Sequence, residues 1–358
     1  MVTQRNDRLP SLKTRLALRF ATTLGRIGEI LPVGFGYWLS DRCGDLIFTF
    51  SPKYRGNVRA NLAHVTGLAE NSPEVRKLVR RVFHYSSRNF FDLMRVSHLT
   101  DDELRAAVIG SRESWERLDR VREAGKGGIV VSAHFGAFDY TGQAIYSNGY
   151  PIIPLTTRTV PVPVYQVVTS LRRSHGLNIE EANSRGIRHV LAAVRRGEFA
   201  GLMADRDFFH NGIPVEFFGT MTSLPPGPAR IARDTGAPII LVFTKRLSKG
   251  YVLTVAEPFH VEKTTDADRD IGLAMARIAR CFEREIREHP EQWVMFQRVW
   301  PDLGATATQP AIAALENSLR QVMLEPDQPS ASPVGSAAGA TMPSALGGEP
   351  PVGIDLDR

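Results

Sequence analysis

The spacing of hydrophobic positions changes near residue 127, and this change separates two kinds of structure. Residues 53–123 carry apolar side chains at helical intervals, as in EVRKLVRRVFHYSSRNFFDLMRV (74–96). Beyond them, short apolar runs alternate with amphipathic segments, of which 186–197 and 227–236 are examples. The runs are GGIVVSA (127–133), YPIIPL (150–155), FAGLMA (199–204), APIILVF (237–243) and YVLTVAE (251–257). This alternation predicts an α/β fold, with helices around a central mixed, mostly parallel sheet of buried strands.

The two ends of the chain have patterns of their own. Residues 11–31 predict a helix whose apolar stripe lies about 120° from an arginine cluster, and 33–50 add aromatic and aliphatic bulk. The stripe consists of Leu16, Phe20, Leu24, Ile27 and Leu31, and the cluster of Arg15, Arg19 and Arg26. Such a helix either lies in a membrane interface or packs on the body of the protein with a solvated basic face.

These patterns divide the chain into three parts. Residues 1–52 are expected to associate with a membrane, and 53–325 are expected to form the main domain, with a further helix over 314–324. Residues 326–358 are rich in Pro, Ala, Gly and Ser. This tail is expected to be disordered, because it has too little apolar surface to offset the entropy of ordering.

Charge and composition narrow the class of protein. The net charge is +6, and residues 1–100 hold 16 Lys and Arg against 7 Asp and Glu. This asymmetry indicates an anionic partner, for which we expect a membrane surface rather than nucleic acid. The two cysteines, Cys43 and Cys281, fit a reducing cytoplasm. The sequence shows neither a secretion signal nor an uninterrupted apolar span of about 18 residues.

The most informative polar positions follow the run at 127–133. His134 is expected just beyond the end of a strand, where open α/β sheets place ligands. Gly136 allows a tight turn or a close approach to substrate, and Asp139 falls near the start of a helix expected over 138–148. The carboxylate could orient the imidazole as a general base. The pair is equally compatible with a structural histidine and an unrelated aspartate at a helix N-terminus.

Several motifs in order give the chain a family resemblance. SAHFGAFD (132–139) resembles the His-x4-Asp/Glu motif of glycerolipid-type acyltransferases. The chain more specifically resembles the bacterial lipid A late (lauroyl/myristoyl) and phosphatidylinositol mannoside acyltransferases, over residues 15–301. The other matching stretches are 54–65, 80–95, the Asp-Arg-Asp, Phe-Phe-Gly and Gly-Pro-Ala elements of 202–243, and 289–301 with Pro-Glu-Gln-Trp. Gln297 stands where many lipid A enzymes have His, which makes the chain more similar to the mannoside enzymes.

The resemblance implies an O-acyltransferase with a glycerolipid acyltransferase-like fold. It would move a fatty acyl group from acyl-CoA or acyl carrier protein to a hydroxyl of a membrane lipid or glycolipid, without a metal or other cofactor. The acceptor classes are a lipid A precursor, a mannosylated phosphatidylinositol and a lysophospholipid. His134 would remove the acceptor's proton while Asp139 orients the ring. No G-x-S-x-G nucleophile elbow occurs, which fits direct transfer.

Further substrate-binding candidates come from the same comparison and from the sheet edge. Arg158 matches a block in which a basic residue faces the anionic part of the acceptor, and Glu216 matches a third block loosely. Asp205 and Arg206 follow a predicted strand and share the sheet edge of His134. Asp205 either orients the histidine or the substrate, or pairs with Arg206. The Glu291–Trp293 segment is expected to serve packing.

Two other classes of protein fit parts of the sequence. A metal-dependent hydrolase could use His134, Asp139, Asp205, Asp207 and His210 as ligands, although their spacing is loose. A non-catalytic membrane-binding protein fits the basic N-terminal region but leaves the histidine and aspartate unexplained. The acyltransferase is the favoured interpretation, located peripherally on the cytoplasmic face of the inner membrane.

Overall fold

The computed structural model describes residues 32–158, 162–248 and 250–301. All of them belong to one of the chain's two compact units, Met1–Thr308. The helix predicted over 11–31, the helix over 314–324 and the tail 326–358 lie outside the described residues, so these predictions and the three-part division remain untested.

A seven-stranded sheet forms the centre of the fold, in the order β1-β9-β8-β2-β5-β3-β4. All neighbouring strands run parallel except β8 and β9. This arrangement confirms the predicted α/β fold with a mixed, mostly parallel sheet. The strands are β1 (Val108–Gly110), β2 (Gly128–Ser132), β3 (Ile152–Thr156), β4 (Glu180–Glu181), β5 (Phe199–Met203), β8 (Ile239–Arg246) and β9 (Tyr251–Val255). A separate antiparallel hairpin consists of β6 (Ile213–Phe217) and β7 (Thr220–Leu224).

Helices cover both faces of the sheet, because successive residues of a buried strand point to opposite sides. Ile129 and Val131 of β2 face one hydrophobic core, and Val130 between them faces another. The first core is shared with α9 (Ser184–Arg195), α10 (Gly227–Thr235) and α11 (Ala267–Glu288). The second is shared with α6 (Arg112–Glu123) and α7 (Phe138–Ser147). The remaining short elements are α5 (Asp101–Ala107), α8 (Val162–Arg172) and a 3-10 turn, η1 (Pro290–Gln292).

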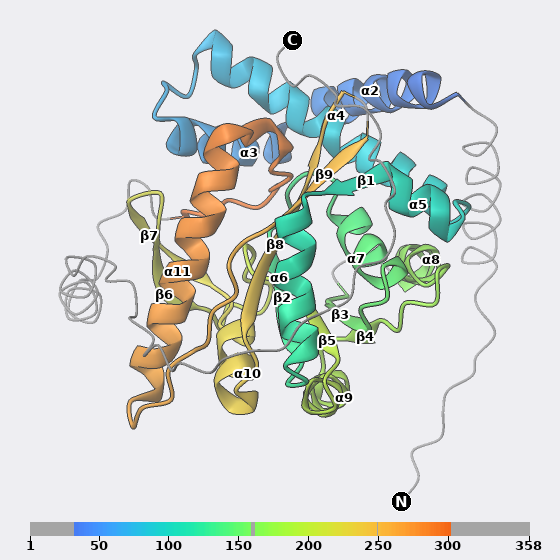
Figure 1. Cartoon of the computed structure of the whole chain (residues 1–358). Coiled ribbons are helices and arrows are strands. Elements are labelled where there is room, and N and C mark those ends of the chain that lie inside the picture. The colour runs from blue at the N-terminus through green and yellow to red at the C-terminus, as the bar shows by residue number, and fades with distance from the viewer. Residues whose placement is uncertain (1–31, 159–161, 249, 302–358) are drawn as a thin grey trace, which may run out of the picture. The chain divides into compact units, whose positions relative to one another are not determined.

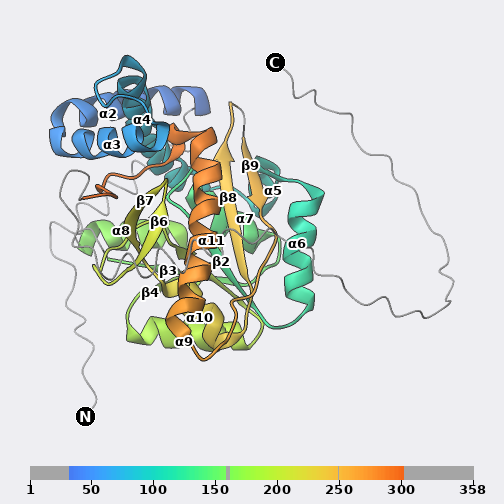
Figure 2. The same cartoon turned by 90° about the vertical axis from the view of Figure 1, so that its left-hand side faces the viewer.

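A layer of three N-terminal helices lies beside one end of the sheet (Figures 1 and 2). They are α2 (Val33–Phe50), α3 (Pro52–Thr66) and α4 (Pro73–Val96). Arg246 at the carboxyl end of β8 binds Asn89 and Asp92 of α4, which fixes the layer to the end where the parallel strands finish. None of the helices in the described residues is both long and apolar enough to cross a membrane.

The α2 helix has the reverse of the usual distribution of side chains. Its buried positions are the small residues Gly36, Ser40 and Gly44, which pack against α4. A Cβ at Gly36 would lie 2.1 Å from the ring of Phe91, so the close contact requires glycine. Its large apolar side chains are exposed instead, namely Phe35, Trp38, Leu39, Leu46, Ile47 and Phe50. We call these six side chains the α2 apolar face.

Candidate active site

His134 lies two residues beyond the end of β2, at the carboxyl edge of the sheet, as predicted. Its side chain is 20% exposed. The ring has aromatic neighbours, since its centroid lies 5.4 Å from that of Phe138 and 6.5 Å from that of Phe208. The imidazole is therefore accessible to a substrate while two apolar rings limit the water around it.

Asp205 is the carboxylate that contacts His134. Its Oδ1 lies 2.7 Å from Nδ1 of the imidazole, and its Oδ2 accepts a hydrogen bond of 2.8 Å from the backbone N–H of His134. The side chain of Asp205 is fully buried. The pairing follows from topology, because β2 and β5 are parallel neighbours with Ser132 opposite Met203, and each polar residue stands two positions further on. Of the roles left open for Asp205, its hydrogen bonds support orientation of the histidine rather than pairing with Arg206.

The predicted contact between Asp139 and His134 is wrong. Asp139 lies in the first turn of α7, and its Oδ1 accepts a hydrogen bond of 2.6 Å from Nε of Arg172 in α8. The sequence interval suggested a pair because both residues lie near the strand-to-helix turn. The turn separates their side chains, and Asp205 from the neighbouring strand occupies the position on Nδ1.

The surroundings of Asp205 favour its ionised form. Burial alone would raise the pKa of this carboxyl, but the charge of His134 and hydrogen bonds from His134 and Trp293 outweigh burial and lower its pKa. Trp293 Nε1 donates to Oδ2 at 3.0 Å. Trp293 is thus a polar partner of the site as well as a packing residue, whereas the sequence pattern indicated packing alone.

The loop after His134 is fixed by its backbone. Gly136 has a φ of 59°, and a Cβ there would lie 2.1 Å from the carbonyl oxygen of Thr244. Its N–H donates to the carbonyl of Gln292 at 2.9 Å, and its own carbonyl accepts a bond of 2.8 Å from Asn89. The close approach at Gly136 is therefore to β8, and it holds the histidine loop in place. The expected approach of Gly136 to a substrate stays a prediction.

A buried polar network connects this loop to the layer of N-terminal helices. Arg246 is 4% exposed and forms an ion pair with Asp92. Its Nη2 also donates to Asn89 Oδ1 at 2.7 Å, and its Nη1 donates to Tyr37 of α2 at 2.9 Å. Because Asn89 also binds the carbonyl of Gly136, the network connects the helical layer to the histidine loop.

Two asparagines of α3 hold the segment that carries Trp293. Asn61 donates to the carbonyl of Gln297 at 2.7 Å and accepts from the N–H of Val299 at 3.0 Å. Asn57 donates to the carbonyl of Phe296 at 3.0 Å. The two motifs at 54–65 and 289–301 are thus parts of one structural unit, which positions the indole on Asp205.

The remaining predicted substrate-binding residues lie in three different places. Arg158 is exposed, two residues after the end of β3. Arg206 lies with its guanidinium carbon 4.0 Å from the centroid of Phe208, and burial lowers its pKa. Its Nε is buried and has no hydrogen-bond partner among the described residues. Glu216 is exposed on β6. Arg206 is the one that shares a neighbour, Phe208, with the histidine.

The carboxylates proposed for a metal hydrolase have separate partners. Asp139 binds Arg172, Asp205 binds His134, and Asp207 binds Ser223 and Gly212. Across 32–158, 162–248 and 250–301, no three His, Cys, Asp or Glu side chains are grouped so that they could hold a metal ion.

Comparison with known proteins connects this site to one family. A family described as "Bacterial lipid A biosynthesis acyltransferase" matches residues 9–301. Phosphatidylinositol mannoside acyltransferase of Mycobacterium tuberculosis is 27% identical over 249 residues, 68% of this chain and 76% of that protein. Its counterpart in Mycolicibacterium smegmatis is 28% identical over 249 residues, 68% of this chain and 78% of the relative. Lipid A biosynthesis acyltransferase of Haemophilus influenzae is 28% identical over 131 residues, 36% of this chain and 41% of that protein. Since the match covers most of the sequence, including the loop of His134 and the segment of Trp293, the chain belongs to the bacterial lipid A biosynthesis acyltransferase family.

Proposed function

We propose that this acyltransferase moves a fatty acyl group from a thioester, acyl-CoA or acyl carrier protein, to a hydroxyl of a membrane glycolipid, with His134 as general base. The observation that carries the proposal is the hydrogen bond of 2.7 Å between His134 Nδ1 and the buried Asp205. An ionised carboxylate can only accept, so Nδ1 carries the proton and Nε2 has the free electron pair that a base needs.

The reaction then requires two proton transfers, one from the acceptor hydroxyl to Nε2 and one from Nε2 to the departing sulfur. Nε2 takes the proton of the acceptor hydroxyl as its oxygen attacks the thioester carbonyl, and Asp205 stabilises the imidazolium that results. The new C–O bond forms, the C–S bond breaks, and the departing sulfur receives the proton from Nε2. A thiolate is a good leaving group, so the mechanism needs no covalent acyl-enzyme.

The acceptor class rests on the relatives and on the basic side chains near the sheet edge. Two relatives are named for phosphatidylinositol mannosides and one for lipid A biosynthesis, and both products are glycolipids. Arg158 and Arg206 supply positive charge after the carboxyl ends of β3 and β5. Arginine suits phosphate because its planar fork can bond two oxygens. A phosphorylated glycolipid is therefore the acceptor that we favour.

The α2 apolar face supports attachment to a membrane surface. An anchored lipid cannot reach a site in water cheaply, because each methylene withdrawn from the bilayer costs about 0.8 kcal/mol. The six exposed apolar side chains of this face offer a surface that a bilayer interface can cover. The basic excess of residues 1–100 would add attraction to anionic headgroups. We propose peripheral attachment to the cytoplasmic leaflet of the inner membrane.

Purified protein, a thioester donor and defined acceptors test this function directly. The expected result is release of free thiol only when a glycolipid acceptor is present, with one added acyl chain found by mass spectrometry. A parallel comparison of lipids from cells with and without the protein should reveal one species that lacks an acyl chain. Release of thiol without formation of an acylated lipid would contradict the proposal, because water would then be the acyl acceptor and the protein a hydrolase.

A further inference from the structure

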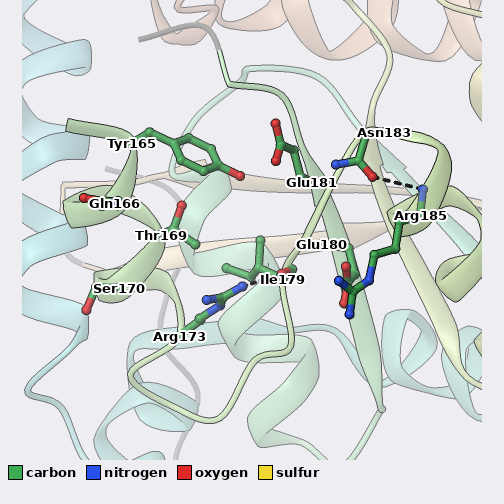
Figure 3. Close-up of a pocket in the computed structure, with 10 residues that line it drawn as sticks. All are labelled: Tyr165, Gln166, Thr169, Ser170, Arg173, Ile179, Glu180, Glu181, Asn183 and Arg185. Atoms are coloured by element: carbon green, nitrogen blue, oxygen red, sulfur yellow. Dashed lines mark hydrogen bonds between the residues drawn. The ribbon is translucent and has the colours of Figure 1, made fainter. Parts of the chain in front are cut away.

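A cavity of about 450 Å³ lies between α8, β4 and the start of α9, away from the loop of His134. Figure 3 shows that side chains from the helix and from the strand border it from two sides. Most of the residues that line it are polar, with both carboxylates and guanidinium groups among them, although carbon atoms form about half of the lining surface. The lining residues are Tyr165, Gln166, Thr169, Ser170, Arg173, Ile179, Glu180, Glu181, Asn183 and Arg185.

One hydroxyl at the cavity, that of Thr169, has no hydrogen-bond partner among the described residues. Its side chain is 7% exposed, and its Oγ1 is buried without a hydrogen bond to any of the described residues. A buried hydroxyl without a partner destabilises the folded protein. In Figure 3 the Thr169 hydroxyl points into the space that Tyr165 and Glu181 also border. A ligand with a hydroxyl group could satisfy it there.

Several polar side chains of the lining already have hydrogen-bond partners within the protein. The side chains without such partners are the ones that a ligand could bind. Glu180 lies 2.7 Å from His189 Nδ1, and Arg173 donates to the carbonyl of Ile179 at 2.7 Å. Asn183 Oδ1 accepts from two N–H groups at the start of α9. Within the part of the chain that the structure describes, the side chains of Glu181 and Arg185 have no hydrogen bond or ion pair. The side chains of Glu181 and Arg185, together with those of the exposed Gln166 and Ser170, therefore remain beside the hydroxyl of Thr169.

The strand register places this cavity at the same edge of the sheet as the catalytic histidine. Glu181 pairs with Thr156 of β3, and Ser132 of β2 pairs with Met203 of β5. β5 also pairs with β3, with Pro154 opposite Gly201, so Thr156 stands opposite Met203. Glu181, Thr156, Met203 and Ser132 therefore stand at one level across the sheet. Three strand intervals of about 4.8 Å separate β4 from β2, or about 14 Å. A headgroup with more than one ring can extend over this distance.

We propose that this cavity binds a sugar ring of the acceptor, so that a second hydroxyl of the glycolipid is presented to His134. The inference rests on the proposed function and specifies its acceptor as a glycolipid recognised through its sugar. Sugar hydroxyls both donate and accept, which matches Glu181, Arg185 and Thr169 together. The lining has two carboxylates, Glu180 and Glu181, against two guanidinium groups, Arg173 and Arg185, so the phosphates of a CoA donor gain no net charge attraction there. The cavity volume lies within the range of about 300–1,000 Å³ usual for ligand sites.

Two conservative substitutions test the sugar site. Thr169→Val keeps the shape of the side chain but removes the hydroxyl, and Glu181→Gln removes the charge. The acceptor is a phosphatidylinositol mannoside dispersed in detergent, and the donor is palmitoyl-CoA. Each variant is expected to raise the KM for the acceptor about five- to tenfold, the effect of one hydrogen bond, with kcat and the KM for palmitoyl-CoA unchanged. The matched control is Glu262→Gln, at an exposed carboxylate on a loop outside the cavity.

A binding measurement separates this inference from the proposed function. The deacylated, water-soluble headgroup of the same mannoside is added, and contact is read by saturation-transfer NMR. Wild-type protein is expected to give a signal that Glu181→Gln weakens, whether or not the protein transfers acyl groups to this lipid. The sugar site is refuted if the parent acylates the mannoside and both variants have the same KM for the mannoside as the parent. It is equally refuted if the KM for palmitoyl-CoA rises instead, because the cavity would then hold the donor.

The folded state of the variants can be checked separately. Thr169→Val removes an unpaired buried hydroxyl, so its thermal midpoint is expected to equal or exceed that of the parent. Glu181 is partly exposed on the two-residue strand β4, and its substitution is expected to leave the midpoint unchanged. A raised KM in a variant with an unaltered midpoint supports the sugar site. A fall in the midpoint of Thr169→Val would contradict the view that its hydroxyl has no partner in the free protein.

Discussion

His134 Nδ1 and Asp205 Oδ1 lie 2.7 Å apart although the two residues are separated by 71 positions in the sequence. The short loops that end β2 and β5 carry them, so the sheet itself sets the distance. This arrangement makes the imidazole the expected base. His134→Ala is therefore predicted to lower kcat by about 10²–10⁴-fold, the usual contribution of a general base. The measurement is thiol release under saturating donor and acceptor, with circular dichroism to establish that the variant folds. An unchanged kcat would overturn the assignment.

The same geometry predicts different effects for the two aspartates. Asp205→Asn should lower kcat by about 10²-fold or more, because an amide cannot stabilise the imidazolium as a carboxylate does. Asp139→Asn is the matched control. It loses an ion pair with Arg172 and not the contact with His134, so its kcat should fall by about tenfold at most. A larger loss in Asp139→Asn than in Asp205→Asn would show that His134 adopts another partner during turnover.

Asp205 also predicts a pH dependence of stability. Its pKa is lower in the folded protein than the ordinary value of 3.8, so its contribution is complete above that value and is lost as the pH falls through the folded pKa. Asp205→Asn lacks this contribution. The difference in unfolding free energy between parent and variant is thus expected to shrink as the pH falls below about 4. Urea denaturation at several pH values between about 5 and 2 measures it. A difference that grows as the pH falls below about 4 would contradict the lowered pKa.

Much of the fold could be predicted from the spacing of apolar residues. The five apolar runs correspond to β2, β3, β5, β8 and β9, and the helix predicted over 138–148 is α7 (Phe138–Ser147). The missed strands have local explanations. β1 and β4 contain three and two residues, too few to show a pattern, and they join the sheet only through their neighbours. The hairpin of β6 and β7 was also missed, because its turn at 218–219 is the main feature of its sequence that indicates a hairpin.

The candidate site could be predicted only in part, because its contacts depend on strand order. His134 was identifiable, since the polar residue after a buried strand marks the sheet edge. Its partner was one of two candidates, Asp139 and Asp205, since the sequence does not state that β2 and β5 are neighbours. Asp139 is closer in sequence, and the family motif also favours it. The role of Trp293 was also hidden, because a tryptophan in an apolar segment usually indicates packing.

The buried ion pair of Asp92 and Arg246 is expected to be important for stability. Removing Asp92 leaves a guanidinium charge buried without its partner, which typically costs about 3–5 kcal/mol. Asp92→Ala is thus predicted to lower the unfolding free energy by this amount, measured by urea denaturation. Glu116→Ala is the control. It breaks the exposed pair of Glu116 with Arg112 on the surface of α6, for which about 1 kcal/mol or less is expected. Equal losses in the two variants would refute a special role for the buried pair.

The α2 apolar face is expected to contact the bilayer. Trp38 and Phe50 are 55% and 78% exposed, so replacing both with Ser should leave the fold intact. Each aromatic side chain that a bilayer interface covers contributes about 1.5–3 kcal/mol when fully buried. The double variant is therefore predicted to partition at least about tenfold less onto anionic vesicles. Ile187→Ser is the control, an exposed apolar residue on α9, which lies far from α2 in Figures 1 and 2.

Salt distinguishes the apolar contribution of α2 from the attraction of the basic residues. Charge attraction weakens as the Debye length falls to about 3 Å at 1 M salt, whereas apolar insertion is not screened. The parent protein should therefore remain partly bound to anionic vesicles at 1 M salt, and the Trp38 and Phe50 double variant should be released. Co-sedimentation with vesicles measures both. If the double variant binds as the parent does at every salt concentration, α2 does not contact the bilayer. The surface that brings His134 to its lipid acceptor must then lie elsewhere on the protein.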